Sequence, residues 1–408
     1  MNPLKILFAS DVSAYEVVGG AERVLREQTV RLARRGHQVH VLARESGGRQ
    51  VRHQTIDGVR ISSFPVDSSR TLRIALASIW RPRALFRDLQ RRVGFDLLNL
   101  HQPFSGLGLL TAPESRGIPV LYTFFSPAFQ ELRTHRGSTR GLIPLYAAVL
   151  ARLERFCLSR AQRIVVLSQY TQSQLREQHG VARERTVVVG GGVDLERFSP
   201  SPVAREALKR ELGCSPDVPL LLTVRNLVPR MGLDHLLRAL KELAGQVELL
   251  LVIGGDGHLV HELKALAAQL GLAPVIRFEG FIPEDRLPLY YQAADFFVLP
   301  TQALEGFGLV TVEALACGTP VLGTPVGATP EILRALQADL VFDGTDSEAI
   351  ARGIRAHLAR RRADPPGYQF LRGRCRAHAV THFDWESKIE RLEQQMVELA
   401  GRGARRLG

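Results

Sequence analysis

Residues 220–255 read LLLTVRNLVPRMGLDHLLRALKELAGQVELLLVIGG, with an apolar run at each end and a leucine-rich segment between them. The runs at 220–224 and 247–255 have the length and composition of strands that are buried on both faces. Between them, leucines at positions 233, 236, 237, 240 and 243 fall on one face of a helix. The stretch therefore predicts a β-α-β unit, in which a helix connects two parallel strands.

The first 45 residues repeat this pattern. An apolar run at 5–10 is followed by a loop that contains Gly19 and Gly20, an amphipathic segment that ends near Gly36, and a second apolar run at 39–43. Further strand-like runs lie at residues 97–100, 120–124, 164–167, 186–189, 296–299 and 321–323. Strands that alternate with helices predict an α/β fold with parallel sheets.

The pattern restarts once, so we predict two facing, doubly wound, Rossmann-like domains. We place the N-terminal domain at residues 1–194 and the C-terminal domain at residues 195–383, on either side of a Gly-rich turn and a Ser/Pro cluster. Residues 384–408 predict an amphipathic helix that packs back toward the N-terminal domain. Ligands of such folds bind at the carboxyl ends of the strands, and we expect a cleft between the domains.

The charge of the chain is concentrated in its first half. The 408 residues carry a net charge of +12, and residues 1–194 hold 28 basic against 15 acidic side chains. This excess favours an anionic partner. A competing explanation is compositional, because only five of the 53 basic residues are Lys and the chain uses Arg throughout.

The cysteines and the apolar runs predict a cytoplasmic protein. The four cysteines are widely spaced and contain no CxxC pair, which is typical of a reduced compartment. The N-terminal apolar run is too short for a signal peptide, and no run is long enough to span a bilayer. No metal site is expected, because the only HxxxH pair, His378 and His382, lies on a tail segment that we expect at the surface.

A phosphate site is predicted at residues 305–321, EGFGLVTVEALACGTPV. Here a glycine-containing loop runs into a helix that starts near Leu309, so that backbone amides and the helix dipole favour an anion. Gly306 and Gly308 allow the backbone to approach a ligand closely. Glu305 and Glu313 are far enough apart to hold two different parts of one ligand.

With these motifs the sequence resembles glycosyltransferase family 4, whose members have the GT-B fold of two Rossmann-like domains. The hallmark of the family is a pair of glutamates separated by seven residues, matched by Glu305 and Glu313. Other similar stretches lie, in order, at residues 19–22, 192–200, 224–237, 254–257, 279–295 and 324–333, so the resemblance covers nearly the whole chain.

The resemblance implies a role for each matching residue. Glu305 would bind hydroxyls of the donor sugar and Glu313 those of the ribose, since carboxylates accept strong hydrogen bonds from hydroxyls. Backbone around the loop would bind the diphosphate, and Gly19 and Gly20 would close over it from the N-terminal domain. The backbone near Phe281 and Ile282 would contact the base. The loop residues are Gly306, Phe307, Gly308 and Leu309.

The chain departs from the family pattern at two places. The family has Arg-Leu-x-x-x-Lys-Gly where this sequence has Asn226 and Met231 in place of the two cations. Arg225 and Arg230 keep the five-residue spacing one position earlier, and we hypothesise that they stabilise the leaving diphosphate. The family often has a His where this chain has Phe125. His101, after the strand at 97–100, is the candidate substitute, although such a His is often structural.

Two basic amphipathic segments, at residues 60–92 and 133–163, lie in the N-terminal half, which usually binds the acceptor in this fold. They suggest a lipid-linked or anionic acceptor and a peripheral position on an anionic membrane surface at its cytoplasmic face. The alternative is ordinary helices that face the core and carry solvated arginines. Nucleic acid is not expected as a partner, because no base-stacking motif accompanies the arginines.

The function expected from the resemblance is retaining, metal-independent transfer of a hexose from a UDP- or GDP-sugar to a hydroxyl acceptor, without a cofactor, in cell-envelope polysaccharide or glycolipid synthesis. One alternative is a nucleotide-sugar epimerase of the same architecture. Another is a catalytically weak subunit that binds a nucleotide sugar, which Asn226, Met231 and Phe125 would explain.

Overall fold

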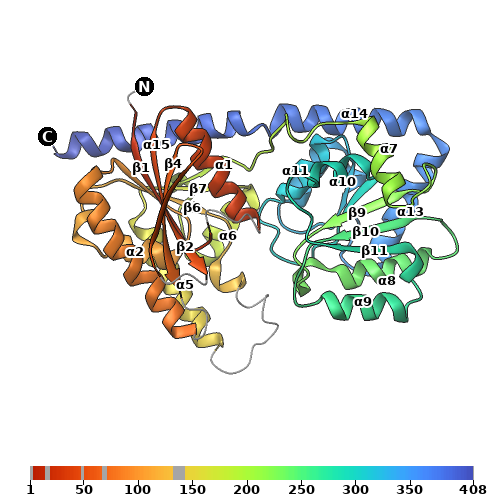
Figure 1. The fold of residues 1–408 in the computed structure, drawn as a ribbon, viewed down its shortest axis with the longest axis horizontal. Coiled ribbons are helices and arrows are strands. Elements are labelled where there is room, and N and C mark those ends of the chain that lie inside the picture. Colours follow the sequence, from red (N-terminus) through yellow and green to blue (C-terminus); the bar gives the residue numbers. More distant parts are fainter. Residues whose placement is uncertain (1–2, 14–18, 47–49, 67–70, 132–142, 408) are drawn as a thin grey trace. The chain divides into compact units, whose positions relative to one another are not determined.

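The computed structural model describes residues 3–13, 19–46, 50–66, 71–131 and 143–407. The chain forms two compact units (Figure 1). Unit 1 consists of Met1–Gly191 together with Trp385–Gly408, and unit 2 is Gly192–Asp384. Each unit is described by itself below.

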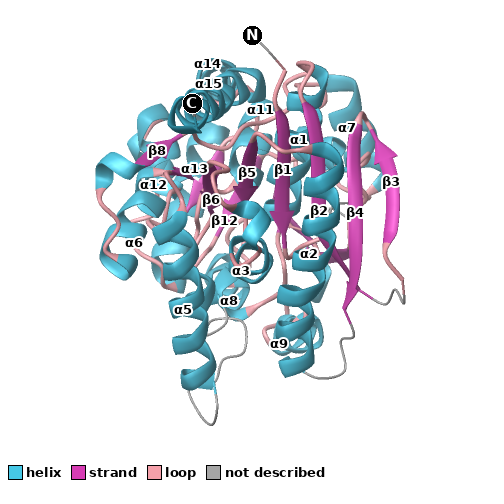
Figure 2. Ribbon diagram, turned by 90° about the vertical axis from the view of Figure 1, so that its left-hand side faces the viewer, coloured by secondary structure: helices cyan, strands magenta, loops and turns pink. Residues whose placement is uncertain are grey.

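The sheet of unit 1 has eight strands within the described residues, in the order β3-β4-β2-β1-β5-β6-β7-β8 (Figure 2). All neighbours are parallel except β3 and β4, which form a hairpin at the edge. The strands are β1 Lys5–Ser10, β2 Gln38–Ser46, β3 Arg52–Ile56, β4 Val59–Val66, β5 Leu97–Leu100, β6 Val120–Phe124, β7 Arg163–Val166 and β8 Thr186–Val188. The order runs in opposite directions from β1, as in a doubly wound sheet.

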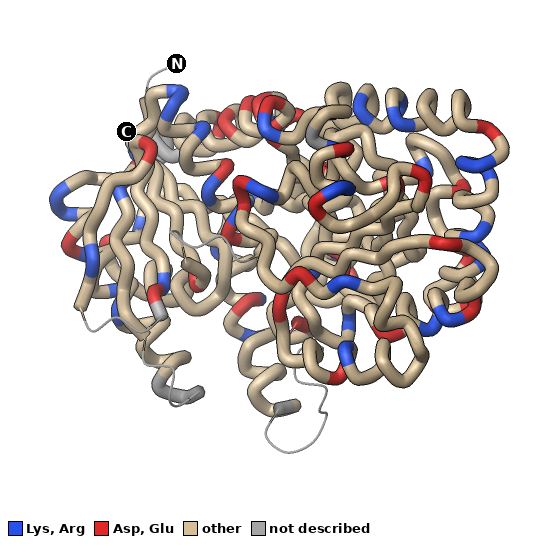
Figure 3. The backbone as a smooth tube through the Cα atoms, turned by 45° about the vertical axis from the view of Figure 1, so that its right-hand side comes forward, with Lys and Arg blue, Asp and Glu red and all other residues tan. Residues whose placement is uncertain are grey.

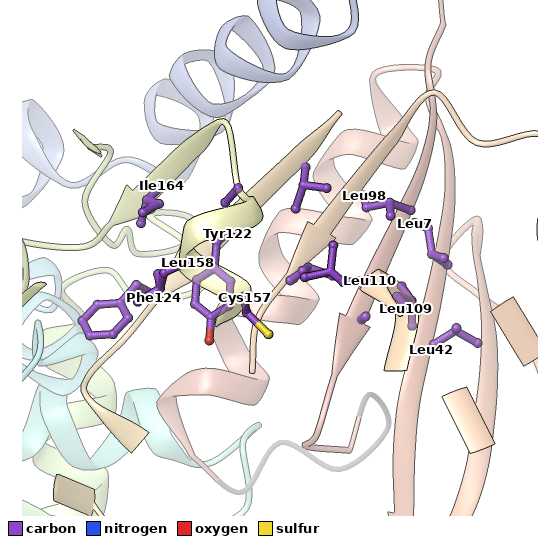
Figure 4. Packing of buried hydrophobic residues seen from close by; sticks show 14 of the residues in the cluster. Leu7, Leu42, Leu98, Leu109, Leu110, Tyr122, Phe124, Cys157, Leu158 and Ile164 are labelled. Carbon is purple, nitrogen blue, oxygen red and sulfur yellow. The ribbon is translucent and has the colours of Figure 1, made fainter. Parts of the chain in front are cut away.

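The helices of unit 1 cover this sheet and enclose an apolar core. They are α1 Gly20–Arg34, α2 Thr71–Val93, α3 Pro103–Leu110, α5 Ile143–Arg160, α6 Gln169–His179 and α15 Trp385–Leu407. Tyr122 and Phe124 of β6 pack with Cys157 and Leu158 of α5 in one buried cluster (Figure 4). Burial raises the pKa of the Cys157 thiol, which therefore stays protonated at neutral pH.

The last helix, α15, belongs to unit 1 although the whole of unit 2 precedes it in the chain. Ile389, Leu392 and Met396 are buried on its inner face. Glu393 anchors it to the end of α1, because its two carboxylate oxygens lie 2.9 Å from Arg35 Nη1 and 2.9 Å from His37 Nε2.

Unit 2 has a parallel sheet of five strands in the order β11-β10-β9-β12-β13. The two runs that open the sequence analysis are neighbours in it, with Leu250 opposite Leu220. The strands are β9 Leu220–Val224, β10 Leu250–Gly254, β11 Ile276–Gly280, β12 Phe296–Leu299 and β13 Val321–Gly323. The helices are α7 Pro202–Glu211, α8 Leu233–Leu243, α9 Val260–Gln269, α10 Leu287–Ala293, α11 Leu309–Ala316, α12 Thr329–Leu336, α13 Ser347–Ala363 and α14 Pro365–His382.

The α/β fold of two doubly wound, Rossmann-like parts is confirmed. The antiparallel edge β3-β4 was not predicted; its turn at Asp57 and Gly58 has positive φ at both residues, as tight hairpins require. One prediction was wrong. His378 is buried rather than on the surface, because its ring packs against those of His382 and Phe383 and its Nε2 lies 3.1 Å from the Ile332 carbonyl oxygen.

Candidate active site

The candidate donor site lies in unit 2 where the strand order reverses. β9 has β10 on one side and β12 on the other, so the loops after β9 and β12 leave the sheet in opposite directions. Arg225 is the first residue after β9, and Thr301 is the second residue after β12. Open α/β sheets bind their ligands at such a switch point, outside the carboxyl ends of the strands.

The predicted phosphate loop leads directly into α11. Gly308 is the N-cap residue of α11 with φ +87°, a left-handed conformation that favours glycine. The amide of Thr311 donates to the Gly308 carbonyl at 2.9 Å. The amides of Leu309 and Val310 before it have no carbonyl one turn earlier in the helix to donate to, and such amides at a helix start suit an anion. Phe307 is buried and packs edge-to-face on Phe383, and this contact holds the loop in place.

Glu305 is held at both its backbone and its carboxylate. Arg225 Nη2 donates to Glu305 Oε2 at 2.5 Å, and Thr301 Oγ1 donates to the same oxygen at 3.1 Å. The amide of Ala328 donates to the Glu305 carbonyl at 2.9 Å. Arg225, Thr301 and Glu305 are all buried, so this carboxylate is fixed in one orientation.

Glu313 lies inside α11 and is also buried. The Tyr291 hydroxyl, from α10, donates to Glu313 Oε2 at 2.9 Å. This contact orients one oxygen of the carboxylate. Burial, and after it the charge of Glu313, raises the pKa of the Cys317 thiol one turn further along.

The two arginines that follow β9 have different surroundings. Besides Glu305, the Arg225 guanidinium contacts Met231, with Nη2 2.8 Å from Sδ. Arg230 Nη1 donates to the Leu304 carbonyl at 3.1 Å, and the Gln302 amide donates back to the Arg230 carbonyl at 2.8 Å. Arg225 is therefore directed at Glu305 itself, whereas Arg230 contacts the loop that carries Glu305.

The predicted base-binding segment follows β11. Phe281 is 62% exposed, whereas Ile282 is buried. Ile282 packs on Gly254 at the end of β10, where a Cβ would lie 2.5 Å from Ile282 Cδ1. Gly255, the first residue after β10, has φ +114° and packs on the carbonyl of Arg225. The loop after β10 and the loop after β9 therefore lie side by side.

In unit 1, His101 lies at the corresponding switch point, between β1 and β5. Its ring is 5.5 Å from that of Phe8 and 5.3 Å from that of Phe125, centroid to centroid. His101 thus contacts the residue at which the family often has a histidine. Burial lowers its pKa to about 3, and neither ring nitrogen has a hydrogen-bond partner among the described residues. The imidazole is neutral at physiological pH.

The other predicted residues of unit 1 lie at the start of α1. Gly19 is the N-cap residue in an extended conformation, and Gly20 begins the helix. The carboxylate of Glu22 faces Gly19, with Oε2 3.0 Å from where a Cβ would be. Burial raises the pKa of Glu22. The structure thus gathers the predicted donor-site residues in unit 2, whereas Gly19, Gly20 and His101 belong to unit 1.

Sequence reasoning missed several residues of these two places. Thr301 and Tyr291 orient the glutamates, and Asp11 accepts from the amides of Phe104 and Ser105 at the start of α3, at 3.1 and 2.9 Å. Asp11 and Thr301 each closely follow a buried strand at a switch point, which is a signal that could have found them. Tyr291 had no such signal. Within the described part of the chain, no group of three His, Cys, Asp or Glu is arranged to hold a metal ion.

Comparisons with known proteins assign the family. The model of "Glycosyltransferase Family 4" matches residues 18–197, and that of "Glycosyl transferases group 1" matches residues 204–365. A D-inositol 3-phosphate glycosyltransferase from Catenulispora acidiphila is 30% identical over 390 residues, which cover 92% of this chain and 89% of that protein. The chain belongs to glycosyltransferase family 4. The predicted family and the prediction of a transferase enzyme are both confirmed.

Other relatives of this family 4 glycosyltransferase agree. A GDP-mannose-dependent alpha-(1-6)-phosphatidylinositol monomannoside mannosyltransferase from Mycolicibacterium smegmatis is 32% identical over 243 residues, 57% of this chain and 62% of that protein. Sucrose-phosphate synthase from Thermosynechococcus elongatus has a TM-score of 0.83 at 21% identity, over 98% of this chain and 100% of that one. A glycosyltransferase involved in lipopolysaccharide biosynthesis has a TM-score of 0.75 at 19% identity, over 97% and 100%. None of these four proteins supports the epimerase alternative.

Proposed function

We propose that this glycosyltransferase moves a hexose from a UDP- or GDP-sugar to a hydroxyl acceptor, with retention of configuration, and that unit 2 binds the donor. The observation that carries the proposal is the cluster of Arg225, Thr301 and Glu305 at the switch point, directly before the start of α11. It combines a fixed carboxylate for hydroxyls with a cation and a helix N-terminus for phosphate.

In this proposal the two glutamates hold the two sugars of the donor. Glu305 accepts hydrogen bonds from hydroxyls of the hexose, and Glu313, oriented by Tyr291, accepts from the ribose hydroxyls. The amides from Gly306 to Leu309 bind the diphosphate. Phe281 and Ile282 contact the base through their backbone.

The leaving diphosphate needs positive charge when the glycosidic bond breaks, and we assign that role to arginine rather than to a metal ion. Arg225 is buried beside Glu305, where the low local dielectric strengthens its field. Arg230 lies on the adjoining turn. In the retaining reaction the departing phosphate oxygen takes the proton from the acceptor hydroxyl, so no further base is required.

We further propose that the acceptor is lipid-linked or anionic and that the enzyme works peripherally at the cytoplasmic face of a membrane. Two observations support this. The relatives named above act, by their names, on a phosphatidylinositol mannoside and on inositol 3-phosphate, which are hydroxyl acceptors beside a phosphate. Residues 1–194 carry the excess of arginine. Within the described residues no helix is long and apolar enough to cross a membrane.

A donor panel tests the proposal. The full chain is mixed with UDP-glucose, GDP-mannose and ADP-glucose, and its melting temperature and donor hydrolysis are measured with EDTA present. We expect one donor to stabilise the protein, by about 2.7 kcal/mol at a hundredfold excess over its Kd. Turnover with inositol 3-phosphate or phosphatidylinositol, followed by NMR of the product anomer, then reports acceptor and stereochemistry. An inverted anomer would disprove retention.

Variants connect that result to the site. Glu305→Gln should abolish turnover, whereas Glu242→Gln, at an exposed glutamate on α8, is the matched control. Arg230→Ala should lower kcat on the order of a hundredfold if Arg230 stabilises the leaving group. Donor binding without turnover by the unmodified chain would favour the nucleotide-sugar-binding subunit over the enzyme. Absence of binding for all three donors would contradict the proposed donor site.

A further inference from the structure

Two helices of unit 1 carry apolar side chains on the face that points away from the core. On α2, Ala75, Ser78 and Phe86 are buried, whereas Leu76 is 49% exposed and Trp80 is 61% exposed. Leu76 and Trp80 are four residues apart, so they are neighbours on the helix surface. The helix α2 therefore has two faces with apolar residues: one is buried against the core of unit 1, and the other, with Leu76 and Trp80, faces outward.

The helix α5 repeats this arrangement. Its inward face is formed by Ala147, Leu150, Cys157 and Leu158, which are buried. Leu145, Val149 and Phe156 are exposed, at 63%, 42% and 39%. Their spacings of four and seven residues place them in one stripe along the opposite face. An exposed stripe of large apolar side chains indicates a surface that meets another apolar phase.

Arginine predominates around these stripes, and the exposed acidic residue of α2, Asp88, is paired with Arg92 at 2.9 Å. On α5 the exposed charged residues are Arg152, Arg155 and Arg160, because the only acidic residue, Glu154, is buried 3.0 Å from His179. On the first half of α2, Arg81 is exposed and the Arg83 guanidinium lies 5.4 Å from the centre of the Trp80 ring. None of the five arginines has a carboxylate partner among the described residues; they are Arg81, Arg83, Arg152, Arg155 and Arg160.

The distribution along the chain explains this excess. Lys and Arg occur throughout both units (Figure 3), with 28 in residues 1–194 and 25 in residues 195–408. The acidic residues differ, with 15 against 26. The positive charge of the first half therefore comes from a shortage of carboxylates, which leaves arginines such as Arg152 and Arg155 without partners. A shared preference for Arg over Lys does not account for that shortage.

The fold brings the two helices to the same edge of unit 1. Both follow strands of the parallel part of the sheet, β4 and β6, and so begin beyond the carboxyl ends of those strands. Both also pack against α3. In Figures 1 and 2 they run past the ends of the strands on the same side of the sheet. The helices α2 and α5, which carry the two exposed apolar faces, therefore extend beyond the same end of the sheet.

We propose that the outward faces of α2 and α5 dock on an anionic lipid bilayer, with Trp80, Leu145 and Val149 entering the interface and Arg152 and Arg155 contacting lipid phosphates. Aromatic and aliphatic side chains flanked by arginines match the headgroup boundary in polarity and charge. A second copy of the chain is a poorer occupant, because it would bring like charges together. The inference rests on the proposed peripheral position and names the surface that would hold it; it is tested by lipid binding alone, so its failure leaves the donor chemistry untouched.

The chain contains its own reporter for this test. It has two tryptophans, and Trp385 is only 2% exposed whereas Trp80 is 61% exposed. With vesicles of phosphatidylcholine and phosphatidylglycerol at low salt, we expect the protein to float with the lipid and the Trp80 emission to shift to the blue. Brominated lipid should quench the shifted component. Pure phosphatidylcholine vesicles and 0.5 M salt should abolish both signals, since exposed charges are screened there.

Matched variants distinguish docking through this surface from nonspecific adsorption of exposed apolar residues to lipid. Leu145→Ser combined with Val149→Ser, and separately Arg152→Gln combined with Arg155→Gln, should each lower partition at least tenfold without changing the melting temperature. Val203→Ser combined with Phe370→Ser removes two apolar residues of unit 2 that are even more exposed, at 80% and 70%, and should leave partition unchanged. Absence of flotation on anionic vesicles overturns the proposal. So does self-association, measured by sedimentation without lipid, that the α5 serine variant abolishes, because the stripe is then an interface between copies.

Discussion

The guanidinium of Arg225 lies 2.5 Å from the carboxylate of Glu305, with Nη2 donating to Oε2. Both side chains are at least nine-tenths buried. The pair connects the loops that follow β9 and β12, the two strands at which the sheet order of unit 2 reverses. The carboxylate proposed to accept hydrogen bonds from sugar hydroxyls is thus in direct contact with the guanidinium proposed to bind phosphate. Sugar binding and phosphate binding at this site are therefore physically coupled.

We predict that Arg225→Gln damages both stability and turnover. Removing one partner of a buried ion pair leaves an uncompensated charge and costs about 3 to 5 kcal/mol of unfolding free energy. Loss of the cation should also lower kcat by about two to three orders of magnitude. Denaturant titration and single-turnover kinetics measure the two effects.

A double variant separates these effects. Combining Arg225→Gln with Glu305→Gln removes both charges, so it should regain much of the stability while staying inactive. Asn226→Ala, at an exposed neighbouring position, is the control and should behave like the unmodified enzyme. Normal turnover by Arg225→Gln would show that the diphosphate obtains its charge elsewhere.

A second prediction concerns the relocated cation. Met231 occupies the position of the family lysine, and its Sδ lies 2.8 Å from Arg225 Nη2. A lysine at position 231 should therefore reach the space that the Arg225 guanidinium now fills. We expect Arg225→Gly to be inactive and Met231→Lys in that background to recover at least tenfold in kcat. The pairing Arg225→Gly with Met231→Leu is the uncharged control, and equal activities of the two double variants would contradict the idea.

The backbone before Glu305 makes a third prediction. Leu304 has φ +57°, in the left-handed region that costs a side-chain-bearing residue about 1 kcal/mol or more. Leu304→Gly should therefore be more stable than Leu304→Ala by about 1 kcal/mol, the reverse of the usual order, because both lack the leucine side chain. Chemical denaturation of the two variants measures the difference. At Ala303, in the same loop but without positive φ, Ala303→Gly should not stabilise.

The sequence predicted the parts of this enzyme that depend on local pattern. Short buried runs such as Leu220–Val224 have the length and composition of strands in a covered sheet, and the helix start at Leu309 follows from its glycines. Which side chains meet across the sheet could not be predicted in the same way. That Arg225 contacts Glu305, 80 residues later, depends on the parallel pairing of β9 with β12. Tyr291 reaches Glu313 through helix packing, which leaves no periodic signal.

Surfaces were the hardest part to predict. The helical face of Leu76 and Trp80 has the pattern of an ordinary core-facing helix, yet both are exposed, because α2 buries Ala75, Ser78 and Phe86 instead. Gly108 of α3 allows α2 to pack closely, since a Cβ at Gly108 would lie 2.3 Å from the Ile79 carbonyl oxygen. Periodicity identified the helix correctly. When a helix has two apolar faces, however, the sequence does not show which face is buried unless the element it packs against is known.

The last prediction concerns His101, whose pKa is lowered by burial to about 3. The unfolded chain binds a proton at its ordinary pKa of about 6.5, whereas the folded chain does not until about pH 3. Falling pH therefore favours the unfolded state, and stability is lost from about pH 6.5 downward, by at most about 1.4 kcal/mol per pH unit. His101→Leu removes this sensitivity, so its stability relative to the unmodified chain should rise between pH 6.5 and pH 4. His40, whose pKa is lowered to about 4, contributes equally to both proteins and cancels in the difference.

Because His101 stays neutral throughout pH 5 to 8, it should add no limb to the pH profile of kcat in that range. A limb that disappears in His101→Gln would show that the ring titrates in the working enzyme.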